Sequence, residues 1–567
     1  MDEFREKAIE LFAQAAEMDR EQARGLAETP PPGVDADLAF PCFPLAKERR
    51  TAPPKIAVDI AGRIDPGEYF AGVSSAGPYV NFKVEPAKFA KLSLERMWED
   101  KDRYGDEPVS RGDRRTVVID FSSPNIAKPF GIGHLRSTVI GNALHKLYSR
   151  LGYEVVRINH LGDWGTQFGK LITAYKLWGD PEQLESEPIK HLLDLYVRFH
   201  KEAETNEALE DEARDWFRKL EQGDGDATEL WEQFREMSLA EFGRIYNRLG
   251  VEFDSFAGEA FYNDKIPDTL REIEAKGLAK PSEGATIVDL AEYDLPPCML
   301  LKQDGSTLYA TRDICAALYR KRTYDFDKML YVVGSPQKLH FQQVFKVLEL
   351  MGYEWAGDCT HVEFGHVRFA DARMSTREGT VLLLEDVLAE AKSRARTAVE
   401  EKNPNLDNKD EVAEQVALGA VVFADLDSRR TKDVVFSWDE ILSFEGETGP
   451  YLQYSNVRVK SVFRKSGLDT PAGVDCSVLI NDEEQKLIKL LADFPRRMRQ
   501  AADNFEPSIL TEHLVTVASA FNKFYHEHRI LVDESQVRDA RLLLAWATGL
   551  VLDKGMDILG IPRPDRM

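Results

Sequence analysis

An apolar run, followed after one helix-length segment by a second strand-like segment, restricts the fold of this chain more than any other feature. Residues 116–121 (TVVIDF) form a nearly continuous apolar run, which is typical of a parallel strand covered on both faces. A loop with Pro124 and Gly131 leads into a predicted helix over 135–150, and a second predicted strand follows at 154–159. Strand, helix and strand in this order form a βαβ unit, so we predict an α/β fold with a doubly wound sheet.

The segments that follow the βαβ unit predict that it belongs to a larger α/β domain. Residues from about 175 to 290 are heavily charged and predict a helical insertion. Strand-like runs return at 307–310 and 329–333, and a helix is predicted over 340–351. We therefore predict one α/β domain over residues 109–445.

Two further domains are predicted at the ends of the chain. An amphipathic helix followed by short segments predicts a small α+β domain over 1–108, with the polar stretch 104–115 as a linker. From about residue 452 the pattern is almost wholly helical, which predicts an all-α bundle over 446–567.

Composition excludes several classes of protein. The chain has 567 residues, 43% of them apolar, and a net charge of −24, which supports several cores and argues against sequence-blind polyanion binding. The longest apolar stretch, 542–552, is far shorter than the roughly 20 residues of a membrane span. The five cysteines have no metal-ligand spacing, so we expect free thiols, no zinc site and a cytoplasmic location. We also expect a monomer and no membrane partner.

A glycine- and histidine-containing turn follows the first predicted strand. The carboxyl end of a strand in an open α/β sheet is where ligands bind. Gly131 and Gly133 allow close approach to the backbone, and the next helix offers free N–H groups to phosphate. His134, at the start of that helix, can donate a hydrogen bond to developing phosphate charge. A plain glycine turn capped by a histidine is the alternative.

Several motifs resemble a known family. The turn ending in His134 resembles the H-x-G-H signature of class I aminoacyl-tRNA synthetases, with Gly131 where the first histidine usually stands. Residues 121–128 (FSSPNIAK) and 160–169 (HLGDWGTQFG) are similar to the arginyl-tRNA synthetase family, and the likeness extends across nearly the whole chain. The resemblance implies a Rossmann-type catalytic domain, ATP as a substrate accompanied by Mg²⁺, and L-arginine and tRNA(Arg) as partners.

A second motif resembles the phosphate-binding loop of the same family. Residues 373–379 (RMSTREG) are similar to its K-M-S-K-S loop, with Thr376 in place of the second lysine. Cations must stabilise the β- and γ-phosphates as pyrophosphate leaves, and we expect Lys128 to supply the missing one. The resemblance implies catalytic roles and ATP contacts for a set of residues: His134, Lys128, Arg373 and Ser375 as catalytic residues, and Gly131, Gly133, His134 and Met374 as ATP contacts.

Selecting arginine requires a carboxylate for its planar guanidinium. Tyr309 and Asp313 are four residues apart and share a face if that segment becomes helical. By resemblance they bind the guanidinium, while Asn125 and Gln337 hold the ammonium and carboxylate, with Ser123 nearby. An ordinary helix cap is the alternative for Asp313, and Glu259 is a weaker candidate for this pocket.

The start of the helical region interleaves aromatic rings with cations, which suits single-stranded bases. It is similar to the start of the family's anticodon-binding bundle, and this implies tRNA contacts for Tyr451, Gln453, Tyr454 and Arg458. We predict an arginine–tRNA ligase that forms arginyl-adenylate. The alternatives are a non-catalytic tRNA-binding paralogue, suggested by Gly131 and Thr376, and a nucleotidyltransferase acting on a small metabolite.

Overall fold

The computed structural model describes residues 1–31, 33–107, 115–369 and 383–567. The chain divides into two compact units. The first contains Met1–Gly105, Tyr454–Arg497 and His513–Lys554. The second contains Asp106–Gln453, Met498–Glu512 and Gly555–Met567.

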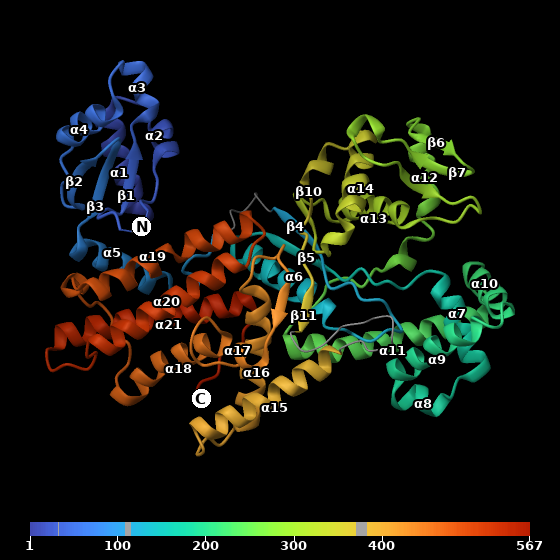
Figure 1. The fold of residues 1–567 in the computed structure, drawn as a ribbon. Helices are drawn as coiled ribbons and strands as arrows, with labels where there is room; N and C mark the ends of the chain where they lie inside the picture. The colour runs from blue at the N-terminus through green and yellow to red at the C-terminus, as the bar shows by residue number, and fades with distance from the viewer. Residues whose placement is uncertain (32, 108–114, 370–382) are drawn as a thin grey trace. The chain divides into compact units, whose positions relative to one another are not determined.

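A three-stranded antiparallel sheet begins the first unit. Its order is β1 (Leu38–Pro41), β3 (Tyr79–Val84), β2 (Phe70–Ala76). The helices of this region are α1 (Asp2–Ala16), α2 (Arg20–Leu26), α3 (Phe43–Arg49), α4 (Pro53–Arg63) and α5 (Pro86–Asp100) (Figure 1). Buried aromatic rings join α1 to the sheet, since Phe12 stacks on Phe40 at 4.3 Å. The predicted α+β character and opening helix are confirmed.

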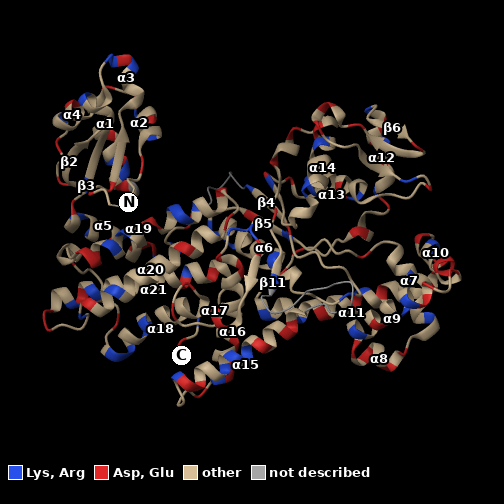
Figure 2. Cartoon of the chain, in the orientation of Figure 1, with Lys and Arg blue, Asp and Glu red and all other residues tan. Residues whose placement is uncertain are grey.

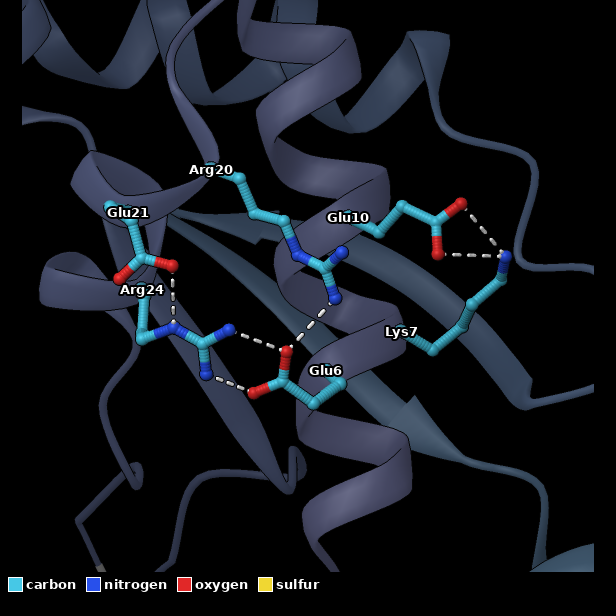
Figure 3. Close-up of polar contacts among 6 residues, drawn as sticks. All are labelled: Glu6, Lys7, Glu10, Arg20, Glu21 and Arg24. Carbon is cyan, nitrogen blue, oxygen red and sulfur yellow. Dashed lines mark hydrogen bonds and ion pairs between the residues drawn. The ribbon is translucent and has the colours of Figure 1, made fainter.

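Charged side chains link α1 to α2 on the surface of this unit (Figure 3). Glu6 accepts a hydrogen bond from Arg20 at 3.0 Å and pairs with Arg24, while Lys7 pairs with Glu10 at 3.2 Å. These groups are partly exposed, so each pair contributes at most about 1 kcal/mol.

The greater parts of four long helices complete the first unit. They are α18 (Gly449–Ser466), α19 (Asp482–Asp503), α20 (Ser508–Glu527) and α21 (Ser535–Leu559), as the all-helical pattern predicts. The segment after α5 packs on them: the Tyr104 hydroxyl donates to the Leu491 carbonyl at 3.0 Å, and Trp98 meets Trp546 at 4.9 Å.

A four-stranded parallel sheet lies at the centre of the second unit. Its order is β10 (Cys359–His361), β9 (Lys328–Tyr331), β4 (Thr116–Asp120), β5 (Glu154–Ile158). Helix α6 (Gly133–Arg150) joins β4 to β5, and α13 (Tyr309–Tyr324) and α14 (Lys338–Leu350) flank β9 in sequence. The predicted βαβ unit and parallel α/β fold are confirmed. Since α13 leads into the start of β9, its own first turn lies at the carboxyl end of the strands.

The predicted insertion is helical only in part. Its helices are α7 (Thr166–Trp178), α8 (Pro181–Ser186), α9 (Pro188–Ala203), α10 (Ala208–Glu221), α11 (Gly225–Leu249) and α12 (Ile266–Ala275). An antiparallel sheet then follows, with β6 (Ala279–Ser282), β7 (Ala285–Val288) and β8 (Cys298–Leu301). Gly284, with φ +85°, forms the tight turn between β6 and β7. The predicted strand at 307–310 is wrong, because α13 already begins at Tyr309.

The remaining elements of the second unit are β11 (Val367–Phe369), α15 (Leu384–Lys402), α16 (Lys409–Leu426), β12 (Val434–Phe436) and α17 (Trp438–Ile441). Strand β11 pairs with β12 in parallel. Helix α15 carries both acidic and basic residues (Figure 2). No helix in the described part of the chain is long and apolar enough to cross a bilayer. All five cysteines are free and buried, as we expected.

Candidate active site at the carboxyl edge of the parallel sheet

The loop that leaves β4 has an unusual backbone. Ser122, Ser123 and Ala127 have φ values of 71°, 46° and 58°, a left-handed region that costs non-glycine residues energy and is concentrated at functional sites. The hydroxyl of Ser123 donates to Asp120 at 2.9 Å. Asp120 in turn pairs with buried Arg320 of α13 at 2.8 Å. The loop is therefore held in a defined shape between β4 and α13.

His134 lies in the first turn of α6, beside the ring of Phe130 at 5.0 Å. Its Nδ1 is buried and has no hydrogen-bond partner among the described residues. Burial lowers the pKa of His134, the contact with the Gly131 backbone opposes this, and the charge of Lys128 lowers it further. The ring is therefore mostly neutral at pH 7, and its buried Nδ1 is unpaired among the described residues.

Lys128 is partly buried in the same loop, and burial lowers the pKa of its ammonium. The ammonium lies 5.6 Å from the ring centre of Tyr196 in α9. The charge of Lys128 thus acts on His134, while the prediction that both residues face phosphate stays a prediction.

The loop residues Arg373, Met374, Ser375 and Thr376 lie outside the described residues, so their predicted roles remain predictions. The chain after them is described and returns to the glycine turn. Leu383 forms a β-bridge with Gly131, and the Leu384 N–H donates to the Phe130 carbonyl at 2.9 Å.

Asp313 lies one turn into α13, and Tyr309 is the first residue of that helix. The ring of Tyr309 is 69% exposed, so it is accessible to a ligand. Nε2 of His340 lies 2.5 Å from Oδ2 of Asp313, and Nε2 of His160 lies 3.9 Å from Oδ1. Burial would raise the pKa of Asp313, but the hydrogen bond from His340 and the charges of His160 and Arg320 hold it below its ordinary value. A partly buried carboxylate is thus kept ionised.

Gln337 and Asn125 are exposed residues at the ends of adjacent strands. Gln337 closes the short helix that follows β9, and Asn125 follows β4. The Oδ1 of Asn125 covers Gly162, where a Cβ would come within 2.0 Å of it. Ser123, Asn125 and Gln337 therefore lie at the carboxyl edge of the sheet, and their arginine contacts stay predictions.

A second carboxyl group lies near Asp313. Burial raises the pKa of Glu259 to about 8, and the carboxylates of Asp313 and Asp163 add to this against the opposing charge of Arg312. Arg312 donates to the Glu259 carbonyl at 3.0 Å and to Oδ1 of Asn263 at 2.6 Å. Glu259 is therefore mostly protonated at pH 7 in the absence of a ligand.

Of the residues predicted to contact tRNA, three lie on accessible parts of α18. Tyr454 is 37% exposed, and the guanidinium of Arg458 lies 4.9 Å from its ring centre. Tyr451 is partly buried one turn earlier.

The prediction that the Gln453 side chain contacts tRNA is wrong. This side chain is fully buried, and its amide donates to the carbonyls of Gln415 and Pro562, each at 2.8 Å. A Cβ on Gly419 would come within 2.4 Å of that amide. Gln453 therefore packs against α16 and has no free donor for RNA.

His160 and His340 both approach Asp313, and neither was predicted from the sequence to have a role. His160 opens the family-like stretch 160–169, which was an available signal. Nothing in the spacing indicates that residues 313 and 340 meet.

Three family descriptions match the chain. "tRNA synthetases class I (R), catalytic domain" matches residues 99–438, "DALR anticodon binding domain" matches 452–567, and "Arginyl tRNA synthetase N terminal domain" matches 2–84. The first of these covers more than half of the chain and includes the parallel sheet and its loops.

Individual relatives agree over the full length. The chain is 51% identical to the arginine–tRNA ligase of Halothermothrix orenii over 568 residues, covering 100% of both. The arginyl-tRNA synthetase of Thermus thermophilus superposes with a TM-score of 0.82 at 26% identity, covering 99% of this chain and 100% of that one. The Plasmodium falciparum enzyme gives 0.79 at 25% identity, with 94% and 93% coverage. This chain belongs to the arginyl-tRNA synthetase family of class I tRNA synthetases.

Proposed function

We propose that the chain is an ATP-dependent arginine–tRNA ligase, which joins L-arginine to the 3′ end of tRNA(Arg). The observation that carries this is the ionised Asp313 carboxylate, partly buried beside His340 and His160 at the ligand edge of the parallel sheet. A fixed carboxylate beside an exposed tyrosine suits the charged, planar guanidinium of arginine.

The reaction has two steps. The carboxylate oxygen of arginine attacks the α-phosphorus of ATP, the bond to the β-phosphate oxygen breaks, and pyrophosphate leaves. A ribose hydroxyl of the terminal adenosine of tRNA then attacks the carbonyl carbon of arginyl-adenylate and releases AMP. No covalent enzyme intermediate is required, so catalysis consists of positioning and charge stabilisation.

The residues predicted to contact ATP have distinct roles in this reaction. His134 and Lys128 stabilise charge on the phosphates, over a backbone that Gly131 and Gly133 leave open, and Arg373, Met374 and Ser375 would close on the triphosphate. Mg²⁺ would accompany ATP, held mainly by phosphate oxygens and water. Asp120, the carboxylate at the end of β4, is paired with Arg320. This pairing is consistent with a Mg²⁺ that takes its ligands from phosphate and water.

The amino-acid end is recognised at the other side of the site. Tyr309 and Asp313 would bind the guanidinium, while Ser123, Asn125 and Gln337 hold the α-ammonium and α-carboxylate. Lysine and ornithine lack the forked donors and citrulline lacks the charge, so each would leave Asp313 poorly paired.

We also propose how the chain is organised around tRNA. Residues 1–108 would form a tRNA-contacting domain, 109–445 the catalytic domain, and 446–567 the anticodon-binding domain. Tyr451, Tyr454 and Arg458 would face RNA. A monomer acting in the cytoplasm is the remaining part of this proposal.

Transfer of labelled arginine to tRNA(Arg) tests the function directly. We expect arginine- and ATP-dependent charging of this tRNA. ATP–pyrophosphate exchange, run with and without tRNA, separates the ligase from a non-catalytic paralogue, which binds tRNA but exchanges no label under either condition.

A further inference from the structure

Asp163 joins two separate segments of the second unit. It follows β5 and is 1% exposed, and its two oxygens have different partners. Oδ1 accepts a hydrogen bond from the Ala260 N–H at 2.8 Å. Oδ2 accepts one from Nε of Arg235 in α11 at 3.2 Å. One buried carboxylate therefore ties the peptide before Ala260 to a long helix.

The backbone next to Asp163 also contacts the 258–260 peptide. The Glu259 N–H donates to the Leu161 carbonyl at 3.0 Å, and the backbone of Trp164 lowers the pKa of the Glu259 carboxyl. A Cβ on Gly258 would come within 2.6 Å of both Asp163 oxygens and of the Leu161 carbonyl. Only glycine allows this approach without displacement of one segment.

Helix α11 supports this arrangement from behind. Trp231 donates to the Asp163 carbonyl at 2.7 Å, and Nη2 of Arg235 donates to the Phe256 carbonyl at 3.0 Å. These two residues are four apart and therefore lie on one face of the helix.

Packing contributes little on the outer side of the 254–261 segment. A cavity of about 570 Å³ lies there, lined by Asp163, Trp231, Arg235 and most of that segment. Glu259 does not line the cavity; its carboxyl interacts with Arg312 and Asp313. Ring contacts of Phe256 and Phe261 pack the ends of this segment, and the hydrogen bonds to Leu161 and Asp163 hold its 258–260 part.

We propose that Asp163 is a positioning residue for arginine recognition. Through Ala260 it fixes the 258–260 peptide, whose Glu259 carbonyl accepts from Arg312 next to Asp313, so that the Glu259 carboxyl stays near the proposed guanidinium site. This inference rests on the proposed function and adds to it the device that orients the second carboxyl group.

Four variants test it in the full chain: Asp163→Ala, Asp163→Asn, Gly258→Ala and Glu259→Gln. Asp163→Ala should raise the KM for arginine roughly 10- to 100-fold, the cost of a displacement of about 1 Å at a binding group, and leave the KM for ATP unchanged. Asp163→Asn should raise the KM for arginine less than Asp163→Ala does, because its amide oxygen can still accept a hydrogen bond from the Ala260 N–H. Gly258 has φ −82°, so alanine acts there only through its Cβ, and it should reproduce the effect with Asp163 intact.

The decisive measurement combines Asp163→Asn with Glu259→Gln. If Asp163 acts through Glu259, the double variant should have the arginine KM of Glu259→Gln alone. Additive effects on that KM would overturn the inference, as would equal increases in the KM values for arginine and ATP.

Asp254→Asn is the matched control. Asp254 lines the same cavity but its carboxylate pairs with Arg157 of β5 at 2.8 Å, so the arginine KM should stay at the wild-type value. If wild-type protein fails to charge tRNA, the proposed function fails. If the wild-type protein charges tRNA normally and the effects of Asp163→Asn and Glu259→Gln on the arginine KM are additive, only the role of Asp163 fails.

Discussion

The Asp313 carboxylate accepts a hydrogen bond from Nε2 of His340 at 2.5 Å, although 27 positions separate the two residues. The contact joins the first turn of α14 to the early part of α13 on either side of β9. It keeps Asp313 ionised and oriented, which is the condition for binding a cationic side chain.

Asp313→Asn removes this charge at nearly constant size. We expect the KM for arginine to rise roughly 10- to 100-fold, since hydrogen bonds between charged groups contribute about 1.5–3 kcal/mol. The KM for ATP should not change in the charging assay. Asp325→Asn is the control, because Asp325 is 91% exposed at the far end of the same helix. Equal effects of the two substitutions would contradict the assignment.

His340→Gln should alter the pH dependence of arginine use. The hydrogen bond from His340 lowers the pKa of Asp313, so its loss raises that pKa. Because the ionised carboxylate binds arginine, kcat/KM for arginine should then fall at a higher pH on acidification than in the wild-type protein. A pH profile between 5 and 8 measures this, and a shift toward lower pH would refute the role of His340.

His134→Ala should affect turnover rather than binding. A lost donor to developing negative charge costs roughly 10²- to 10³-fold in rate. Pyrophosphate exchange should slow by this factor with the KM for arginine unchanged. His145→Asn, on the same helix α6, should keep the wild-type rate. Unchanged exchange in His134→Ala would remove this residue from the mechanism.

Arg458 tests the predicted RNA-facing part of α18. Arg458→Gln should weaken tRNA binding and reduce the slope of log affinity against log salt by about 1 if the guanidinium contacts a phosphate. Arg458→Lys keeps the charge but not the planar group over Tyr454, so it should preserve the salt slope. Fluorescence titration with tRNA(Arg) at several salt concentrations measures both, and an unchanged slope in Arg458→Gln would contradict phosphate contact.

His513 predicts acid sensitivity of the helical bundle. Burial lowers its pKa to about 4, so the folded chain keeps it neutral while the unfolded chain takes up a proton below about pH 6.5. Stability from this group is complete above pH 6.5 and declines as the pH falls toward 4. By pH 5 the loss is about 2 kcal/mol.

Thermal melting at pH 7 and pH 5 measures this decline. His513→Gln cannot titrate and should lose less stability between the two values than the wild-type protein. His526→Gln, at an exposed position of the same helix, should follow the wild-type protein. If His513→Gln and the wild-type protein decline equally, His513 is not the sensitive group.

Local patterns determined much of this protein. The apolar run at 116–121 predicted β4, because a parallel strand covered on both faces cannot carry many polar side chains, and the strand-like segment at 154–159 predicted β5. The glycine turn and His134 were placed correctly at a strand's carboxyl end for the same reason. The helical character of residues beyond 452 also followed from periodicity alone.

The tertiary structure decided what local patterns could not. Gln453 lies in a segment of aromatic and basic residues, yet its amide is buried against two carbonyls, because helix packing determines which face of α18 is covered. Two contacts join residues far apart in the chain: the one between Asp313 and His340, and the hydrogen bond from Ala260 to Asp163. Such pairs depend on strand order and helix direction, which a one-dimensional pattern does not specify.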